Sequence, residues 1–333
     1  MTPTATALVL GATGGIGGEV ARTLLARGWR VRGLSRKPQD GGGIDWRVGD
    51  ALVPADVSAA ADGAGLIVHA VNPPGYRDWD KLVLPMLEST IAAARAAGAA
   101  ILLPGTIYNF GADAFPLLRE DSPENPPTRK GAIRVAMEAR LSAVADAGTP
   151  VLIVRAGDFF GPRPGNSWFS QGMVKPGQRP RSISLPGSPG VGHAWAYLPD
   201  VAETMVRLVE AGEPRGFSRF HMAGHWDPDG TAMAEAIRRA VGDPALKARR
   251  LPWALLRVAG LFNPTLREMG EMRYLWQHPV ELDNARLVAA LGREPRTPLD
   301  VAVRETLVGL GCLPPGARQP RSAASGRTPA SAG

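Results

Sequence analysis

Hydrophobic and polar positions follow two periods along the first 155 residues. Short, mostly apolar runs recur, and longer stretches with an apolar residue every three or four positions lie between several of them. This alternation is typical of β-α-β units, and apolar strands indicate a parallel sheet covered on both faces. We therefore predict a doubly wound α/β fold, with strands near 8–10, 29–34, 44–48, 66–70, 99–103 and 151–155 and clear helices at 79–97 and 130–147.

A glycine-rich turn follows the first predicted strand. Gly11 permits a tight turn, Gly14 lets the backbone approach a phosphate, and Gly17 lets the next helix pack close to the sheet. The N–H groups and dipole of that helix would face an anion. The turn predicts a Rossmann dinucleotide site that includes Gly11, Thr13, Gly14, Gly15, Ile16 and Gly17.

The second half of the chain is less regular. Residues 161–192 are rich in Gly, Pro and Ser and are expected to form a long loop. A strand is expected at 217–222, and helices near 200–211, 230–241, 253–261, 265–276, 284–291 and 299–309. We predict a dinucleotide-binding domain at 1–160, a smaller C-terminal substrate lobe at 161–313 from which the chain returns to the sheet, and a disordered tail at 314–333.

Composition narrows the function classes. The net charge is +7, but basic residues are scattered and mostly arginine, so no nucleic-acid partner is expected. No stretch approaches the length of a membrane span, and we predict a cytoplasmic protein without a membrane partner. The single cysteine, Cys312, and the absence of metal-ligand spacing predict no metal site.

Four segments together resemble a known family. They are the glycine turn, Thr106 followed by Phe110-Gly111, the segment 155–162 (Arg-Ala-Gly-Asp-Phe-Phe-Gly-Pro), and Tyr197-Leu-Pro-Asp200. In this order they resemble the extended short-chain dehydrogenases/reductases, the NAD-dependent epimerase/dehydratase family, over about residues 5–310. The resemblance implies an α/β nucleotide-binding fold that hosts epimerases, dehydratases and reductases, and also proteins that only bind the cofactor.

The resemblance locates the cofactor-binding residues. Where the family often has an acidic residue after the second strand, this chain has Ser35-Arg36-Lys37, which suits a 2′-phosphate and favours NADP over NAD. Asp50 matches the position that contacts the adenine, and Ala70 and Val71 match the wall beside the ribose and nicotinamide. The expected cofactor contacts beyond the glycine turn are Ser35, Arg36, Asp50, Ala51, Ala70, Val71, Lys130 and Gly157.

The catalytic pattern departs from the family. Thr106 stands at the Ser/Thr position, but where Tyr-x-x-x-Lys is expected the chain reads Lys130-Gly-Ala-Ile-Arg134. Three interpretations remain open. Lys130 is itself the acid/base, as in the similar isoflavone-reductase-like group; or Tyr108 supplies a hydroxyl from the strand face that carries Thr106; or no proton is transferred.

The expected function is that of an NADP-dependent oxidoreductase, in which hydride passes to a carbonyl or conjugated double bond of a small organic substrate. The substrate candidates are Asp158, His193 and Tyr197. A non-catalytic NADP-binding redox sensor or partner-binding protein is the alternative, and a nucleotide-sugar epimerase/dehydratase is the second. The resemblance also allows a homodimer through the helices at 79–97 and 130–147.

Overall fold

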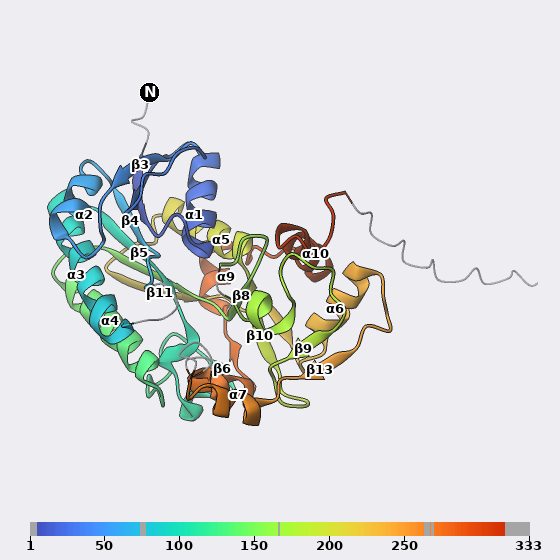
Figure 1. The fold of residues 1–333 in the computed structure, drawn as a ribbon. Coiled ribbons are helices and arrows are strands. Elements are labelled where there is room, and N and C mark those ends of the chain that lie inside the picture. The colour runs from blue at the N-terminus through green and yellow to red at the C-terminus, as the bar shows by residue number, and fades with distance from the viewer. Residues whose placement is uncertain (1–4, 74–77, 166, 263–266, 268–269, 317–333) are drawn as a thin grey trace, which may run out of the picture.

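A seven-stranded parallel sheet forms the centre of the protein (Figure 1). The computed structural model describes residues 5–73, 78–165, 167–262, 267 and 270–316. The strands run in the order β11-β7-β5-β4-β1-β2-β3. Their bounds are β1 Thr6–Leu10, β2 Arg30–Ser35, β3 Asp45–Val48, β4 Leu66–His69, β5 Ala100–Gly105, β7 Val151–Arg155 and β11 Phe217–His221.

Helices cover both faces of this sheet, which confirms the predicted doubly wound fold. One face packs against α2 (Pro54–Ala61), α3 (Trp79–Ala97) and α4 (Arg129–Asp146). The other face packs against α1 (Gly15–Ala26), α5 (Leu198–Glu210) and α9 (Ala285–Leu291). The inner strands β1, β4, β5 and β7 are buried at nearly every position, as expected for strands covered on both faces. Polar residues occur in β2, β3 and β11, and β3 at the sheet edge is largely exposed.

The C-terminal lobe has its own apolar core beside the sheet (Figure 1). Helices α6 (Ala232–Val241) and α10 (Leu299–Gly309) pack together there. Small sheets join β8 (Asp158–Phe160), β10 (His193–Tyr197) and β12 (His225–Asp227), and also β9 (Ile183–Leu185) and β13 (Ala248–Arg250). Helix α7 (Trp253–Ala259) lies at the lower edge of the molecule in Figure 1. Strand β6 (Leu117–Leu118) pairs with β14 (Glu281–Leu282).

Several local expectations change. The expected loop at 161–192 contains a π-helix, Phe169–Met173, and strand β9, since aromatic residues there pack into the lobe core. The helix expected at 265–276 is a 3-10 helix at Met272–Trp276, and its earlier part falls largely outside the described residues. The predicted disorder beyond residue 316 also lies outside them. Among the described residues, no helix combines the length and apolarity needed to span a bilayer.

Candidate active site

One cavity of about 800 Å³ opens where β1, β2, β4 and β5 end. The carboxyl ends of parallel strands are where doubly wound folds bind ligands. Most of the predicted site residues line this cavity, although they are spread over about 150 positions of the chain. The predicted residues that line it are Gly11, Thr13, Gly14, Gly15, Ile16, Ser35, Arg36, Asp50, Ala51, Ala70, Val71, Thr106, Tyr108, Lys130, Arg134 and Asp158.

The glycine turn has the shape that a dinucleotide requires. Gly11 has a φ of +86°, and a Cβ there would lie 2.5 Å from the Ala70 carbonyl oxygen. A Cβ at Gly17 would lie 2.3 Å from the Gly11 carbonyl oxygen, so Gly17 acts through packing and does not line the cavity. At Gly14 the nearest atom would be 3.2 Å away. A Cβ at Gly15 would lie 2.6 Å from the Pro164 carbonyl oxygen, so the segment before Gly165 packs on the start of α1. Gly14 and Gly15 still line the cavity, on the side where free helix N–H groups favour an anion.

The part of the cavity beside the ends of β2 and β3 carries exposed cations. Ser35 is the last residue of β2, and Arg36 and Lys37 follow it along the cavity wall. Asp50 lies opposite after β3 and accepts a hydrogen bond from the Leu52 N–H at 3.0 Å. A hydroxyl and two cations provide the donors that a ribose 2′-phosphate needs.

His69, the last residue of β4, directly precedes Ala70 and Val71 and is buried. The Thr90 hydroxyl donates to the Met86 carbonyl at 3.1 Å, so it accepts from His69 Nδ1 at 2.7 Å. Burial, with the charge of Arg134, lowers the pKa of His69 to about 3. Burial beside Arg155 lowers the pKa of His221 similarly, to about 3. Both imidazoles are neutral in the folded protein at neutral pH.

These two histidines predict acid sensitivity. As the pH falls below about 6.5, unfolded histidines bind protons, whereas the folded ones do so only near pH 3. The free energy of unfolding should therefore fall on acidification, by up to roughly 1.4 kcal/mol per pH unit for each histidine. Urea unfolding at pH 7.5 and 5.5 measures this loss. A His69→Gln variant should show a smaller loss than the parent, and an equal loss would contradict the assignment.

Lys130 and Arg134 project from the start of α4. The Thr128 hydroxyl caps this helix by accepting the Gly131 N–H at 3.0 Å. Lys130 is buried, and its Nζ lies 3.6 Å from Glu271 Oε2, while its backbone N–H donates to Glu271 Oε1 at 3.2 Å. The Arg134 guanidinium lies over the Trp79 ring, 5.1 Å from its centroid. A carboxylate from the C-terminal lobe thus holds the lysine beside the cavity.

Tyr108 reaches the cavity by another route than strand alternation. Strand β5 ends at Gly105, and Tyr108 belongs to a 3-10 helix, Ile107–Asn109. The prediction that strand alternation places Tyr108 on the same face as Thr106 is therefore wrong, because β5 ends before Thr106. Tyr108 nevertheless lines the same cavity as Thr106 and Lys130.

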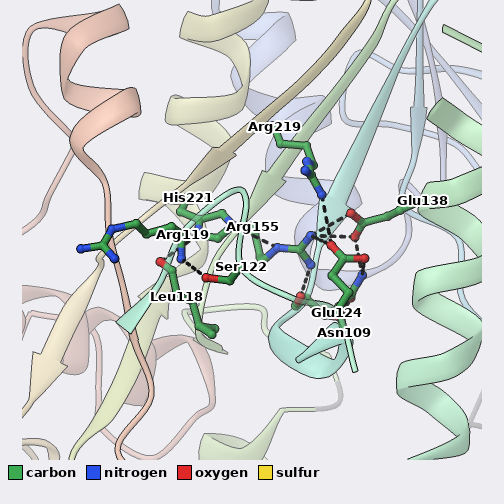
Figure 2. Close-up of polar contacts among 10 residues, drawn as sticks. Asn109, Leu118, Arg119, Ser122, Glu124, Glu138, Arg155, Arg219 and His221 are labelled. Carbon is green, nitrogen blue, oxygen red and sulfur yellow. Dashed lines mark hydrogen bonds and ion pairs between the residues drawn. The ribbon is translucent and has the colours of Figure 1, made fainter. Parts of the chain in front are cut away.

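A buried ionic network supports the loop that carries Thr106 (Figure 2). Arg155 donates to both oxygens of Glu138, at 2.9 and 2.8 Å, and to the Thr106 carbonyl oxygen. Glu138 also accepts from Asn109 Nδ2 at 2.9 Å. Figure 2 shows Arg155 between these carboxylates and His221, with Arg219 reaching Glu124 from above. The network fixes the backbone at Thr106 from behind the cavity.

The structure does not bring the three substrate candidates, Asp158, His193 and Tyr197, to one cavity. Asp158 Oδ2 lies 2.8 Å from His193 Nε2, but only Asp158 lines the large cavity. His193 stacks on Trp276 and lines a second cavity of about 90 Å³ in the lobe. Tyr197 is not brought to either cavity, because it is buried and donates to Glu305. Gly157 packs against the Ala194 carbonyl, where a Cβ would lie 2.2 Å away.

Other residues of the cavity carry no sequence signal. His69, Gln171 and Met272 line the cavity, and Glu271 holds Lys130 beside it. None of these four residues has a motif or a fixed spacing to the glycine turn, so only folding brings them together. In the described part of the chain, no group of three or more His, Cys, Asp or Glu residues could hold a metal ion.

Comparison with protein families identifies one match. Residues 7–218 match the family described as NAD dependent epimerase/dehydratase family. This range includes the glycine turn, both cations after β2, Thr106, Lys130 and Asp158. No curated protein sequence matches the chain.

Solved structures share the fold at low identity. UDP-N-acetylglucosamine 4-epimerase from Bacillus cereus is 14% identical with a TM-score of 0.70, covering 92% of this chain and 99% of that one. UDP-glucose 4-epimerase from Bifidobacterium longum, solved with NAD+ and UDP, is 15% identical with a TM-score of 0.69, covering 92% and 98%. The Bordetella bronchiseptica enzyme WbmH, solved with NAD+, is 18% identical with a TM-score of 0.68, also covering 92% and 98%.

Proposed function

Because this chain belongs to the NAD-dependent epimerase/dehydratase family, we propose that it is an NADP-dependent oxidoreductase acting on a small organic substrate. The proposed reaction is hydride transfer to a carbonyl or a conjugated double bond. The observation that carries this proposal is the single cavity that joins the glycine turn and Arg36 to Thr106 and Lys130.

The residues divide into holding and reacting groups. The turn from Gly11 to Gly17 would hold the pyrophosphate, and Ser35, Arg36 and Lys37 the 2′-phosphate. A bound reduced nicotinamide supplies the hydride. Arg134, one helical turn after Lys130, would hold the nicotinamide ribose.

Thr106 and Lys130 would act on the substrate itself. The Thr106 hydroxyl would orient the acceptor oxygen, and the Lys130 ammonium would donate the proton that completes the alcohol or the saturated carbon. The ion pair with Glu271 positions the Lys130 Nζ at the cavity wall. Burial of Lys130 excludes water from the point of proton transfer.

The epimerases of similar fold suggest a second reaction. One of them is named for UDP-N-acetylglucosamine, and another was solved with NAD+ and UDP. Against that reaction, the family's tyrosine is replaced by Lys130, and epimerisation as the family performs it depends on that phenol. A non-catalytic NADP sensor is the other class, and it differs by binding the cofactor without turnover.

Calorimetric titration with NADPH, NADP+, NADH and NAD+, followed by a screen of carbonyl substrates, separates these functions. Micromolar NADPH binding with substrate-dependent NADPH oxidation is the expected result. Tight cofactor binding without any turnover would favour the sensor, and UDP-sugar binding with interconversion would favour the epimerase. Binding of none of the four nucleotides would overturn the proposal.

The cofactor preference predicts the effect of Arg36→Ala. Loss of a charge-assisted contact with the 2′-phosphate should weaken NADPH binding about ten- to a hundredfold and leave NADH binding nearly unchanged. The titration above measures both constants. Lys81→Ala, which removes an exposed lysine that does not line the cavity, is the control for a general charge effect. An equal loss for both nucleotides would contradict the role of Arg36.

A further inference from the structure

Helix α7 and the turn after it expose an unusual amount of apolar surface. Leu255 is 69% exposed, Val258 58%, Leu261 74% and Phe262 87%. They make up four of the seven large hydrophobic residues exposed in the described part of the chain. The Leu261 and Phe262 N–H groups donate to the Val258 and Ala259 carbonyls, which continues the helical turn. Leu255, Val258 and Phe262 therefore recur at positions i, i+3 and i+7 of one helical face.

This segment contributes little to the lobe core. None of the α7 residues is fully buried. The anchor is Trp253, whose Nε1 donates to the Pro186 carbonyl at 2.9 Å and whose ring lies 6.0 Å from that of Trp168. A seven-residue helix is not stable on its own in water, so its apolar face gains most from a partner.

The sequence that contains α7 is predominantly positive, although Glu268 follows it directly. From Lys247 to Arg267 the sequence contains five cations and no acidic residue. These cations, Lys247, Arg249, Arg250, Arg257 and Arg267, are all exposed. The chain's net charge is +7, so this segment carries a large part of the excess.

The charge excludes two kinds of partner. In a two-fold dimer each residue of the face would meet the same face of the other copy, and the cations would repel one another. A nucleic acid would satisfy the cations, but its phosphates offer nothing to Leu261 or Phe262. An anionic bilayer offers headgroups to the cations and acyl chains to the apolar side chains.

We propose that the surface formed by Leu255, Val258, Leu261 and Phe262, together with the exposed cations Arg249 and Arg257 of the same chain segment, binds peripherally to anionic lipid bilayers. The helix lies in the interface and does not span it, in keeping with the absence of a spanning helix among the described residues. Trp253 contacts Trp168, which lines the large cavity. The anchor of α7 therefore packs against a residue of the cavity wall.

Co-sedimentation of the full chain with vesicles tests the proposal. We expect binding to phosphatidylcholine containing about one third phosphatidylglycerol and little binding to phosphatidylcholine alone. The pair Leu261→Asp and Phe262→Asp should lower the partition coefficient at least tenfold. The pair Arg249→Gln and Arg257→Gln should lower it by roughly fivefold per charge and reduce its salt dependence.

Matched controls make each outcome decisive. The pair Val48→Asp and Val53→Asp adds the same two charges at residues that are 67% and 43% exposed and distant in sequence, and it should bind vesicles as the parent does. Circular dichroism and urea unfolding check that every variant folds. Absence of vesicle binding, or binding retained by the Leu261/Phe262 pair, would overturn the proposal. The proposal would also be overturned if the protein bound a short DNA duplex but not vesicles. The same holds if it did not bind vesicles and instead self-associated in a way that Phe262→Asp abolishes. The test needs no turnover, so its failure is distinguishable from failure of the proposed reaction.

Discussion

Replacing Lys130 by alanine should lower kcat by about a hundredfold to ten-thousandfold, while NADPH affinity stays within a few-fold. The range is what a positioned general acid contributes. Lys130 lines the cavity at the start of α4 and has Glu271 beside its Nζ. No other described lysine besides Lys37 lines this cavity, and Lys37 lies beside the end of β2. Steady-state kinetics with the best NADPH-oxidising substrate, together with calorimetry, measures both quantities.

Two further variants distinguish the interpretations of this site. Tyr108→Phe removes the hydroxyl of the alternative donor and should leave kcat within a few-fold. Glu271→Gln keeps the shape of the side chain but removes the charge that holds Lys130, and a change in the pH profile of kcat is expected. Unchanged turnover in Lys130→Ala, combined with a large loss of turnover in Tyr108→Phe, would identify Tyr108 as the proton donor in place of Lys130.

Replacing Glu138 by alanine should lower the free energy of unfolding by about 3–5 kcal/mol. The change would leave the buried Arg155 guanidinium without its bidentate carboxylate, and an uncompensated buried charge is strongly destabilising. Arg155 has only 1% of its side chain exposed, and the remaining carboxylate, Glu124, is 3.4 Å away. Burial raises the pKa of Glu124, and Glu124 makes only one long contact with the guanidinium, so it is a weak substitute for Glu138. Equilibrium denaturation measures the loss.

Comparison with a double variant separates the charge from the packing. Changing both Glu138 and Arg155 to methionine removes both charges and retains apolar volume, so it should recover part of the stability lost in Glu138→Ala. Arg219→Ala, which breaks a partly exposed ion pair with Glu124, should cost less than about 1 kcal/mol. A loss in Arg219→Ala as large as that in Glu138→Ala would show that burial of Arg155 is not the cause.

The sequence predicts the sheet well, and most of the site residues it indicates line one cavity. Strand and helix periods are local properties, and the glycines of the turn are required by backbone geometry that a Cβ would obstruct, as at Gly17. The doubly wound fold and the family are confirmed. The roles of the individual site residues stay predictions.

The parts of the site that the sequence does not predict are contacts between residues that are not neighbours in the chain. Glu271 contacts Lys130, which lies 141 positions earlier in the chain. Arg155 at the end of β7 contacts Glu138 in α4, which lies 17 positions earlier. No local pattern encodes either contact. Helix α2 has no named counterpart in the sequence interpretation, because its eight residues are largely alanine and show no wide apolar stripe. Tyr108 lies in a 3-10 turn whose start after Gly105 the strand pattern does not reveal.

The order of the strands has a consequence for synthesis on the ribosome. Strand β7 is complete at Arg155, but its outer neighbour β11 begins only at Phe217. Until that segment emerges, the nascent chain presents β7 as an open edge that can pair with another nascent chain. Ribosomes that follow one another closely on the same message would expose several such β7 edges near one another. Chaperone demand should therefore peak between these two points of elongation and end once β11 joins the sheet.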